Sequence, residues 1–269
     1  MSIASPPSAI QTLLNLMAEL RDPVRGCPWD RKQTWQSLLP YTLEETYEVV
    51  DAVDRNDPAA LCDELGDLLL QVVFMAQIAK EQGLFDFEAV ARGISEKLVR
   101  RHPHVFDETV YASEIEQKQA WEAIKQVERA EQAQTGLFAG IPAALPALRR
   151  AQKIQKRAAH VGFDWANWQQ VVPKVHEELD EVAEAVAHQE PFARIEEEMG
   201  DVLLAASNMA RMLGVDAENA LRLSNRKFEQ RFERVEALLA DDQLSLEAAS
   251  LAQMEAAWEA AKLEEKSKT

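Results

Sequence analysis

Glycine and cysteine are scarce in this chain, and their scarcity limits the chemistry that it can perform. Of 269 residues, only 9 are glycine and 2 are cysteine. Neither a G-x-x-x-x-G-K-[ST] string nor a G-x-G-x-x-G string occurs, so the two common glycine-rich phosphate loops are excluded. Cys27 and Cys62 form no C-x-x-C pair, which excludes a disulfide framework and is typical of the reducing cytoplasm.

Long apolar runs and an excess of positive charge are also lacking. The longest apolar stretch, from Leu65 to Ala79, is interrupted by Asp67, Gln71 and Gln77 and is too short to span a bilayer. We see no signal peptide and expect a cytoplasmic protein without a membrane partner. The formal net charge of −17 argues against a nucleic-acid partner, because a phosphate backbone would be repelled. An acidic protein that handles phosphates needs local positive charge, which divalent cations commonly supply.

What the sequence does contain is helical periodicity. Hydrophobic residues make up 47% of the chain, and they recur at i, i+3 and i+4 spacing, whereas the alternation typical of strands is missing. Pro40 and Pro173 are predicted to lie in the first turns of their helices. The run Asn56-Asp57-Pro58 is predicted to form a turn between two helices. These features predict an all-α fold.

The chain contains two copies of one module. The segment "ELGDLL" (64–69) recurs as "EMGDVL" (198–203), and "AWEAIK" (120–125) recurs as "AWEAAK" (257–262). Because the matching segments keep the same order and nearly the same separation, they indicate an internal repeat.

Glycine and proline residues indicate where the two copies meet. The run "EQAQTGLFAGIPAALP" (131–146) interrupts the helical periodicity. We predict an N-terminal module over residues 1–130, a linker over 131–142 and a C-terminal module over 143–269. Each module is predicted to be a short antiparallel bundle of about four helices.

Each copy carries a Glu-Glu-x-x-Glu motif on one helix and a Glu-x-x-Asp motif on the next. The carboxylates are Glu44, Glu45, Glu48, Glu64 and Asp67 in the first copy and Glu177, Glu178, Glu181, Glu198 and Asp201 in the second. No Lys or Arg lies between Tyr41 and Val53, and the helix that carries Glu64 is apolar nearly all round, which predicts burial on most sides. Since buried carboxylates are costly when nothing neutralises them, each cluster needs a source of positive charge.

Two sources of that charge are open. A hard divalent cation prefers oxygen ligands, and because the set contains no His or Cys, Mg²⁺ is favoured over Zn²⁺, with Mn²⁺ as an alternative. Alternatively, the carboxylates pair with Lys97 and Arg101 in the first copy and with Lys227 and Arg231 in the second. The repetition of the whole acidic pattern on two helices, in both copies, favours the metal.

At these residues the sequence resembles the MazG family of all-α nucleoside-triphosphate pyrophosphohydrolases, in its two-module bacterial form, over nearly the whole chain. Supporting runs are "GCPWDRKQTW" (26–35), "RRHPHVF" (100–106), "QKIQKRAAHVGFDW" (152–165) and "NRKFEQRF" (225–232). The resemblance implies Mg²⁺-dependent hydrolysis of nucleoside triphosphates between the α and β phosphates, with broad tolerance for the base and a house-cleaning role in the nucleotide pool. It also implies a homodimer in which helices from two chains complete each site.

The resemblance assigns roles to individual residues. All ten carboxylates would be metal ligands. Substrate-binding residues would be Lys227, Arg231, Trp258 and Lys262 in the second copy and Lys97, Arg101, Trp121 and Lys125 in the first. We expect Glu178, Glu181, Lys227 and Arg231 to be catalytic, although spacing does not identify which Glu is the general base. Four tryptophans that precede the acidic helices either pack or stack on a base: Trp29, Trp35, Trp165 and Trp168.

The two copies are not equivalent. Pro103 must end or kink the helix that carries Lys97 and Arg101, whereas Lys227 and Arg231 lie within a long helical run. We therefore expect the second copy to carry most of the turnover. A hypothesis from another class is a helical scaffold whose acidic clusters bind ions or partner proteins without catalysis.

Overall fold

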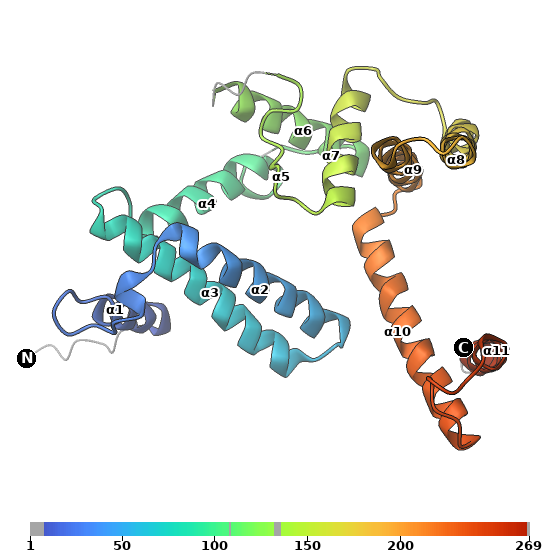
Figure 1. Ribbon diagram of the computed structural model, residues 1–269. Helices are drawn as coiled ribbons and strands as arrows, with labels where there is room; N and C mark the ends of the chain where they lie inside the picture. Colours follow the sequence, from blue (N-terminus) through green and yellow to red (C-terminus); the bar gives the residue numbers. More distant parts are fainter. Residues whose placement is uncertain (1–7, 108, 132–135, 268–269) are drawn as a thin grey trace, which may run out of the picture. The chain divides into compact units, whose positions relative to one another are not determined.

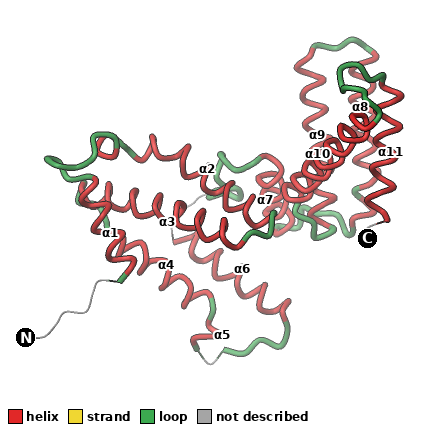
Figure 2. The backbone as a smooth tube through the Cα atoms, turned by 90° about the horizontal axis from the view of Figure 1, so that it is seen from below, coloured by secondary structure: helices red, strands yellow, loops and turns green. Residues whose placement is uncertain are grey.

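The computed structural model describes residues 8–107, 109–131 and 136–267. Within these ranges the regular elements are eleven α-helices and two short 3-10 helices, and no strand is present (Figure 2). The predicted all-α fold is therefore confirmed. None of the described helices combines the length and the apolar character that crossing a lipid bilayer requires.

The chain divides into two compact units, residues 1–126 and 127–269. The division falls within one helix, α6 (Glu114–Glu131). The linker over residues 131–142 stays a prediction, because residues 132–135 lie outside those that the structure describes.

Unit 1 is built around a pair of neighbouring helices, α2 and α3, which lie side by side in Figure 1. Its elements before α6 are α1 (Ala9–Leu20), η1 (Asp30–Lys32), α2 (Trp35–Asp54), α3 (Pro58–Glu81), α4 (Phe87–Arg101) and α5 (Pro103–Phe106). Helices α1 and α4 also pack against α3. The core is formed by the buried side chains of Met17, Leu38, Val73, Phe74 and Ile78.

The turn that joins α2 to α3 forms as the sequence predicted. Asn56 has a φ of 52°, Asp57 caps α3 by accepting hydrogen bonds from two backbone N–H groups, and Pro58 is the first residue of the helix. The prediction for Pro40 is wrong. A capping box between Thr34 and Ser37 begins α2 at Trp35, so that Pro40 lies inside the helix rather than in its first turn.

Arg21 joins three elements of unit 1. Its guanidinium makes three hydrogen bonds to the Glu81 carboxylate at the end of α3, and the two shortest are Nε–Oε1 at 2.8 Å and Nη2–Oε2 at 2.6 Å. It also donates to the carbonyl oxygen of Asp30 in η1. The Arg21 side chain is only 7% exposed, and its hydrogen bonds hold the pKa of Glu81 below the usual range of a glutamate.

We expect Arg21→Met to lower the free energy of unfolding at neutral pH by about 2 kcal/mol, because a largely buried pair loses one partner. The difference from the unmodified protein should shrink as the pH falls through the pKa of folded Glu81, since protonated Glu81 no longer needs the cation. Urea unfolding followed by circular dichroism measures this. Arg92→Met is the control, because its pair with Glu88 is exposed; equal losses in the two variants would contradict the prediction.

Unit 2 presents its elements in the same order as unit 1. They are α7 (Ala147–His160), η2 (Trp168–Gln170), α8 (Val172–Ala187), α9 (Phe192–Met212), α10 (Ala217–Asp241) and α11 (Leu251–Ser267). Helix α8 packs against α9, α7 packs against α9 and α10, and α11 packs against α10. Pro173 lies in the first turn of α8, as predicted.

The helix after the acidic pair differs between the units. In unit 1 it stops at Arg101, where His102 leaves helical geometry (φ −127°, ψ 55°) before Pro103 begins α5. In unit 2 the corresponding helix, α10, continues without a break from Ala217 to Asp241, and Lys227 and Arg231 lie near its middle. The predicted effect of Pro103 on the helix is confirmed.

Candidate functional site

Each unit brings carboxylates from its two acidic helices together. In unit 1, oxygen atoms of Glu45, Glu48 and Glu64 lie within 4.8 Å of one another. In unit 2, the same holds for Glu178, Glu198 and Asp201. Each set draws on two helices, α2 and α3 or α8 and α9, so that the packing of the helix pair itself builds the cluster.

The remaining predicted ligands lie around these sets rather than within them. Glu44, Asp67 and Glu177 are exposed. Asp67 lies near enough to contribute its negative charge to the environment of Glu45. Glu181 shares a hydrogen bond with Glu178. The clusters therefore contain a core of three carboxylates with further carboxylates beside them, a set of oxygen ligands that suits a hard divalent cation.

The cluster of unit 2 is more buried than that of unit 1. Glu178 is 6% exposed and Glu198 is 3% exposed. In unit 1, Glu45 and Glu64 are half-buried and Glu48 is exposed. A cation or a developing charge is influenced more strongly by carboxylates in the drier site, because water screens them less.

The cluster of unit 1 has no direct cationic partner within the described part of the chain, although the charge of Arg55 lies near enough to Glu64 to oppose the rise of its pKa. No Lys or Arg in that part forms an ion pair with Glu45, Glu48 or Glu64. Burial raises the pKa of Glu45, and its hydrogen bond with Glu48 raises it further. The pKa of Glu64 is raised by burial first and then by the charge of Glu48. These carboxylates therefore fit a divalent cation, which would offset both the cost of burying them and their mutual repulsion.

The cluster of unit 2 has internal counter-charges. Lys174 Nζ lies 2.9 Å from Glu178 Oε1 and 2.7 Å from Glu177 Oε1, and Arg194 pairs with Glu198. Lys174 holds the pKa of Glu178 below its usual range, while the hydrogen bond from Glu178 raises the pKa of Glu181.

The pairing alternative from the sequence named the wrong partners for unit 2. It expected Lys227 and Arg231, but the cations that contact the cluster are Lys174 and Arg194. Each lies one turn before its glutamate on the same helix, four residues away. That i, i+4 spacing is a signal that the sequence contains, but Arg194 has no cationic counterpart in the first copy and therefore lies outside the repeated pattern.

The predicted phosphate-binding residues of unit 2 gather where α10 meets α11. Arg231 makes hydrogen bonds of 2.9 and 2.7 Å to the two carboxylate oxygens of Glu265, and its guanidinium lies 4.8 Å from the centre of the Trp258 ring. Lys262 pairs with Glu259 at 2.7 Å. Lys227 lies one turn before Arg231 and is exposed.

A cavity of about 310 Å³ opens beside the unit 2 cluster. Glu178, Asp201 and Lys174 are among its lining residues, and most of the others are apolar. Neither Arg231 nor Trp258 is among its lining residues. Within one chain, the structure therefore places the carboxylates and the predicted phosphate-binding residues of unit 2 in different surroundings.

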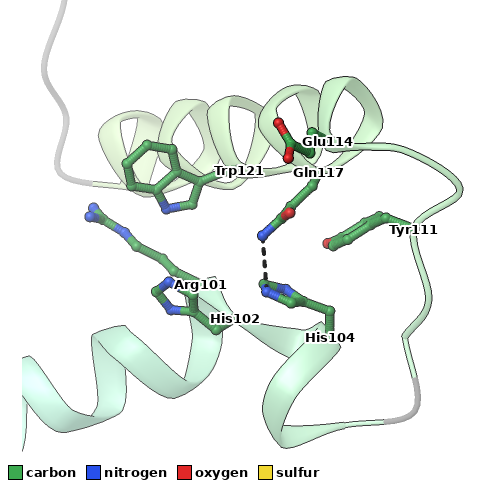
Figure 3. A pocket seen from close by; sticks show the side chains of 7 residues that line it. All are labelled: Arg101, His102, His104, Tyr111, Glu114, Gln117 and Trp121. Atoms are coloured by element: carbon green, nitrogen blue, oxygen red, sulfur yellow. Dashed lines mark hydrogen bonds between the residues drawn. The ribbon is translucent and has the colours of Figure 1, made fainter.

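Unit 1 has a pocket of about 300 Å³ at the end of α4. Figure 3 shows Trp121 projecting from α6 towards Arg101, with His104 and Gln117 joined by a hydrogen bond. The lining residues are Arg101, His102, His104, Tyr111, Glu114, Gln117 and Trp121. Lys125 Nζ lies 3.3 Å from the centre of the Trp121 ring, and Lys97 lies one turn before Arg101 on α4. Thus the pocket gathers predicted substrate-binding residues but no carboxylate of the unit 1 cluster.

Comparison with known proteins identifies a matching family and similar relatives. The family model described as the MazG nucleotide pyrophosphohydrolase domain matches residues 33–106 and 167–236. A protein of Escherichia coli (strain K12) named nucleoside triphosphate pyrophosphohydrolase is 52% identical over 95% of this chain and 98% of its own. A Thermotoga maritima protein named nucleoside triphosphate pyrophosphohydrolase/pyrophosphatase MazG is 45% identical over 94% of this chain and 95% of its own. The crystal structure of a MazG-related protein from Thermotoga maritima aligns with 43% of this chain and 98% of that one, at 31% identity and a TM-score of 0.38.

Proposed function

The chain belongs to the MazG family of nucleotide pyrophosphohydrolases, and on that premise we propose that it hydrolyses nucleoside triphosphates between the α and β phosphates. The products are a nucleoside monophosphate and pyrophosphate. The observation that carries the proposal is the group formed by Glu178, Glu198 and Asp201, of which the two glutamates are buried, at the edge of a cavity large enough for a small ligand. The proposal includes broad tolerance for the base, a house-cleaning role and a cytoplasmic location.

Mg²⁺ is the proposed cofactor, with Mn²⁺ as an alternative. Glu178, Glu198 and Asp201 would hold it in unit 2, and Glu45, Glu48 and Glu64 would hold it in unit 1, with the neighbouring carboxylates assisting. A divalent cation bound there supplies positive charge to the phosphate oxygens and makes water more acidic.

Other side chains of unit 2 are proposed to act as the general base and to bind the phosphates. Glu181 has a raised pKa and lies beside the cluster, which suits a general base that takes a proton from the attacking water. If Glu178 and Glu198 held a cation, Lys174 would keep its pair with Glu177 and Arg194 its pair with Glu197, so that both side chains would stay beside the cluster, where their charge favours a bound triphosphate. Lys227, Arg231 and Lys262 are proposed to hold phosphate oxygens and the departing pyrophosphate.

A homodimer would bring the separated parts of the site together. The cavity of unit 2 is lined by carboxylates of its cluster, whereas the pocket of unit 1 is lined by predicted phosphate-binding residues.

Apolar side chains near the clusters are also exposed: Leu43, Tyr47, Leu65 and Leu69 in unit 1, and Met199, Leu203 and Leu204 in unit 2. The sequence predicted burial for the acidic half of α3, and in the single chain Leu65 and Leu69 contradict that prediction. Burial of these side chains in a second copy would remove apolar surface from water.

We expect incubation with a nucleoside triphosphate and Mg²⁺ to yield the monophosphate and pyrophosphate in equal amounts, and EDTA to abolish both products. Ion-exchange chromatography with a pyrophosphate-specific assay measures them. Accumulation of a nucleoside diphosphate with orthophosphate would show cleavage between the β and γ phosphates and contradict the proposal. Absence of turnover for all substrates would support the helical scaffold instead.

A further inference from the structure

The pocket at the end of α4 in unit 1 differs in charge from the protein as a whole. The chain carries a formal net charge of −17, yet among the described residues that line this pocket Glu114 is the single acidic one, beside Arg101 and two histidines. Lys125 lies close by, with Nζ 3.3 Å from the centre of the Trp121 ring. Cationic and protonatable side chains therefore outnumber carboxylates here, and the local charge becomes more positive once a histidine gains a proton.

Two hydrogen-bond donors in the pocket have no partner among the described residues. They are the hydroxyl of Tyr111 and Nε1–H of Trp121. Trp121 is 38% exposed, and the Tyr111 hydroxyl is not fully buried. Figure 3 shows both side chains projecting towards the imidazoles of His102 and His104, Trp121 from α6 and Tyr111 from the segment before it. A ligand in the pocket can therefore accept hydrogen bonds from either side.

The backbone fixes the tautomer of His102. Its Nδ1 lies 2.7 Å from the carbonyl oxygen of Leu98, and because a carbonyl can only accept, Nδ1 carries a hydrogen. Nε2 is then the atom that gains a proton when the ring becomes charged. It forms no hydrogen bond with a described residue and is not fully buried. His102 therefore offers a protonatable nitrogen whose charged form is a third donor to a ligand.

His104 supports this arrangement without binding a ligand itself. Its Nε2 lies 3.0 Å from Nε2 of Gln117, and its Nδ1 is buried. The centre of its ring lies 5.7 Å from that of His102 and 5.5 Å from that of Tyr111. We therefore assign His104 the role of a wall against which the two ligand-binding side chains pack.

The charge of His102 would respond to an anion in the pocket. The other charged or titratable side chains at the pocket come from α4, α5, α6 and the segment before α6: Arg101, His104, Lys125, Glu114 and Tyr111. Since a nearby negative charge stabilises a charged imidazole, an anion bound among these groups favours protonated His102. Anion binding and proton uptake are therefore coupled.

We propose that this pocket binds a small inorganic oxyanion of the phosphate class without a metal ion. Its oxygen atoms accept hydrogen bonds from four side chains: Arg101, protonated His102, Tyr111 and Trp121. Such an anion has many acceptor atoms and few hydrogens to donate, which suits a pocket of donors. Orthophosphate and pyrophosphate share this chemistry, and a pocket of about 300 Å³ has room for either.

This site is separate from the one that the proposed function requires. No carboxylate of the unit 1 cluster is among the described residues that line it, so a bound anion does not need Mg²⁺. His102 also lies outside the repeated pattern, because Phe232 follows Arg231 at the corresponding place in the second copy. The site therefore gives unit 1 a binding role of its own, independent of nucleotide hydrolysis.

The first experiment is isothermal titration calorimetry of the unmodified protein in buffer freed of metal ions, with sulfate, orthophosphate and pyrophosphate as separate probes. Sulfate keeps its two negative charges between about pH 6 and about pH 8, so a change in its affinity comes from the protein. We expect saturable binding, with sulfate held at least about fivefold more tightly at the lower pH because His102 takes up a proton. Orthophosphate and pyrophosphate, compared at one pH, show which of them the pocket prefers. An affinity for sulfate that does not change with pH would overturn the proposal.

The second experiment repeats the sulfate titrations on three variants. Tyr111→Phe removes one donor, keeps the ring and should weaken binding about fivefold at both pH values. His102→Gln removes the titratable nitrogen, retains an amide that can donate to Leu98, and should abolish the pH dependence. His188→Gln is the matched control, because His188 is exposed and lies outside the pocket lining; it should bind as the unmodified protein does.

All three variants keep the predicted phosphate-binding residues of unit 2, so binding there would persist in each of them. Equal affinities in the unmodified protein, Tyr111→Phe and His102→Gln would therefore place the anion elsewhere and overturn the proposal. Circular dichroism checks that each variant is folded, and Tyr111→Phe decides the matter if His102→Gln is not. Because neither a nucleoside triphosphate nor Mg²⁺ is present, the outcome does not depend on whether the proposed function holds.

Discussion

Glu178→Gln is expected to reduce pyrophosphate release by at least about 100-fold, while Glu45→Gln leaves most of it intact. Both substitutions remove one negative charge from a three-carboxylate cluster. Glu178, however, is buried and lines a cavity, whereas Glu45 is half-buried and belongs to a cluster that includes the exposed Glu48. Helix α10 also continues on both sides of Lys227 and Arg231, whereas α4 ends at Arg101, so we expect the second pair to be positioned more tightly than Lys97 and Arg101.

The measurement is the initial rate of pyrophosphate release at saturating Mg²⁺ for the two variants in parallel. Far-ultraviolet circular dichroism should give the same helical content for both, because Gln has nearly the same shape as Glu. A loss of turnover in Glu45→Gln with near-normal turnover in Glu178→Gln would reverse the assignment of the active unit. Normal rates in both variants would refute the metal assignment.

Arg231→Met is expected to lower kcat/KM by about 100-fold, because a cation that steadies the departing phosphates is removed. In the structure this guanidinium is held by Glu265 and lies over Trp258. It therefore also has a structural role, and the two roles must be separated. Glu265→Gln breaks the same ion pair while it keeps the cation.

If Arg231 binds phosphate, Glu265→Gln should retain activity within about threefold of the unmodified protein, although both variants lose the modest stabilisation of a partly exposed ion pair. Steady-state kinetics and thermal unfolding on both variants test this. Parallel losses of activity in the two variants would show that Arg231 acts only by joining α10 to α11.

The fold was predictable where a local rule decides the outcome. Asp57 and Pro58 begin α3 because a capping carboxylate and a proline without N–H suit the start of a helix, and Pro103 ends α4 because it disfavours helical geometry in His102. Pro40 was misplaced because the capping box at Thr34 begins the helix a turn earlier and the helix accommodates the proline. In such cases two local signals, the capping box and the proline, compete to set the first residue of the helix. The sequence alone does not show which of them is stronger.

The candidate site was predictable in its carboxylates but not in its surroundings. A repeated motif on two helices indicates that Glu178 and Asp201 can meet. It does not indicate that α7 contributes Gln155 to the cavity beside them, because that contact depends on how helices distant in sequence pack. The binding partner of Arg231 was equally hidden, since Glu265 lies outside every motif.

Lys174 and Arg194 also affect how strongly the folding of each unit depends on a bound cation. The two buried carboxylates of unit 2 receive positive charge from their own helices, which offsets part of the cost of burying them before any cation binds. The raised pKa values of Glu45 and Glu64 mean that folding of unit 1 without a cation becomes less favourable as the pH rises from acidic towards neutral. If unit 1 binds the proposed cation, its folded population rises with the free concentration of that cation. On that premise the stability of unit 1 depends more on a cation than that of unit 2, where Lys174 and Arg194 already face the buried carboxylates.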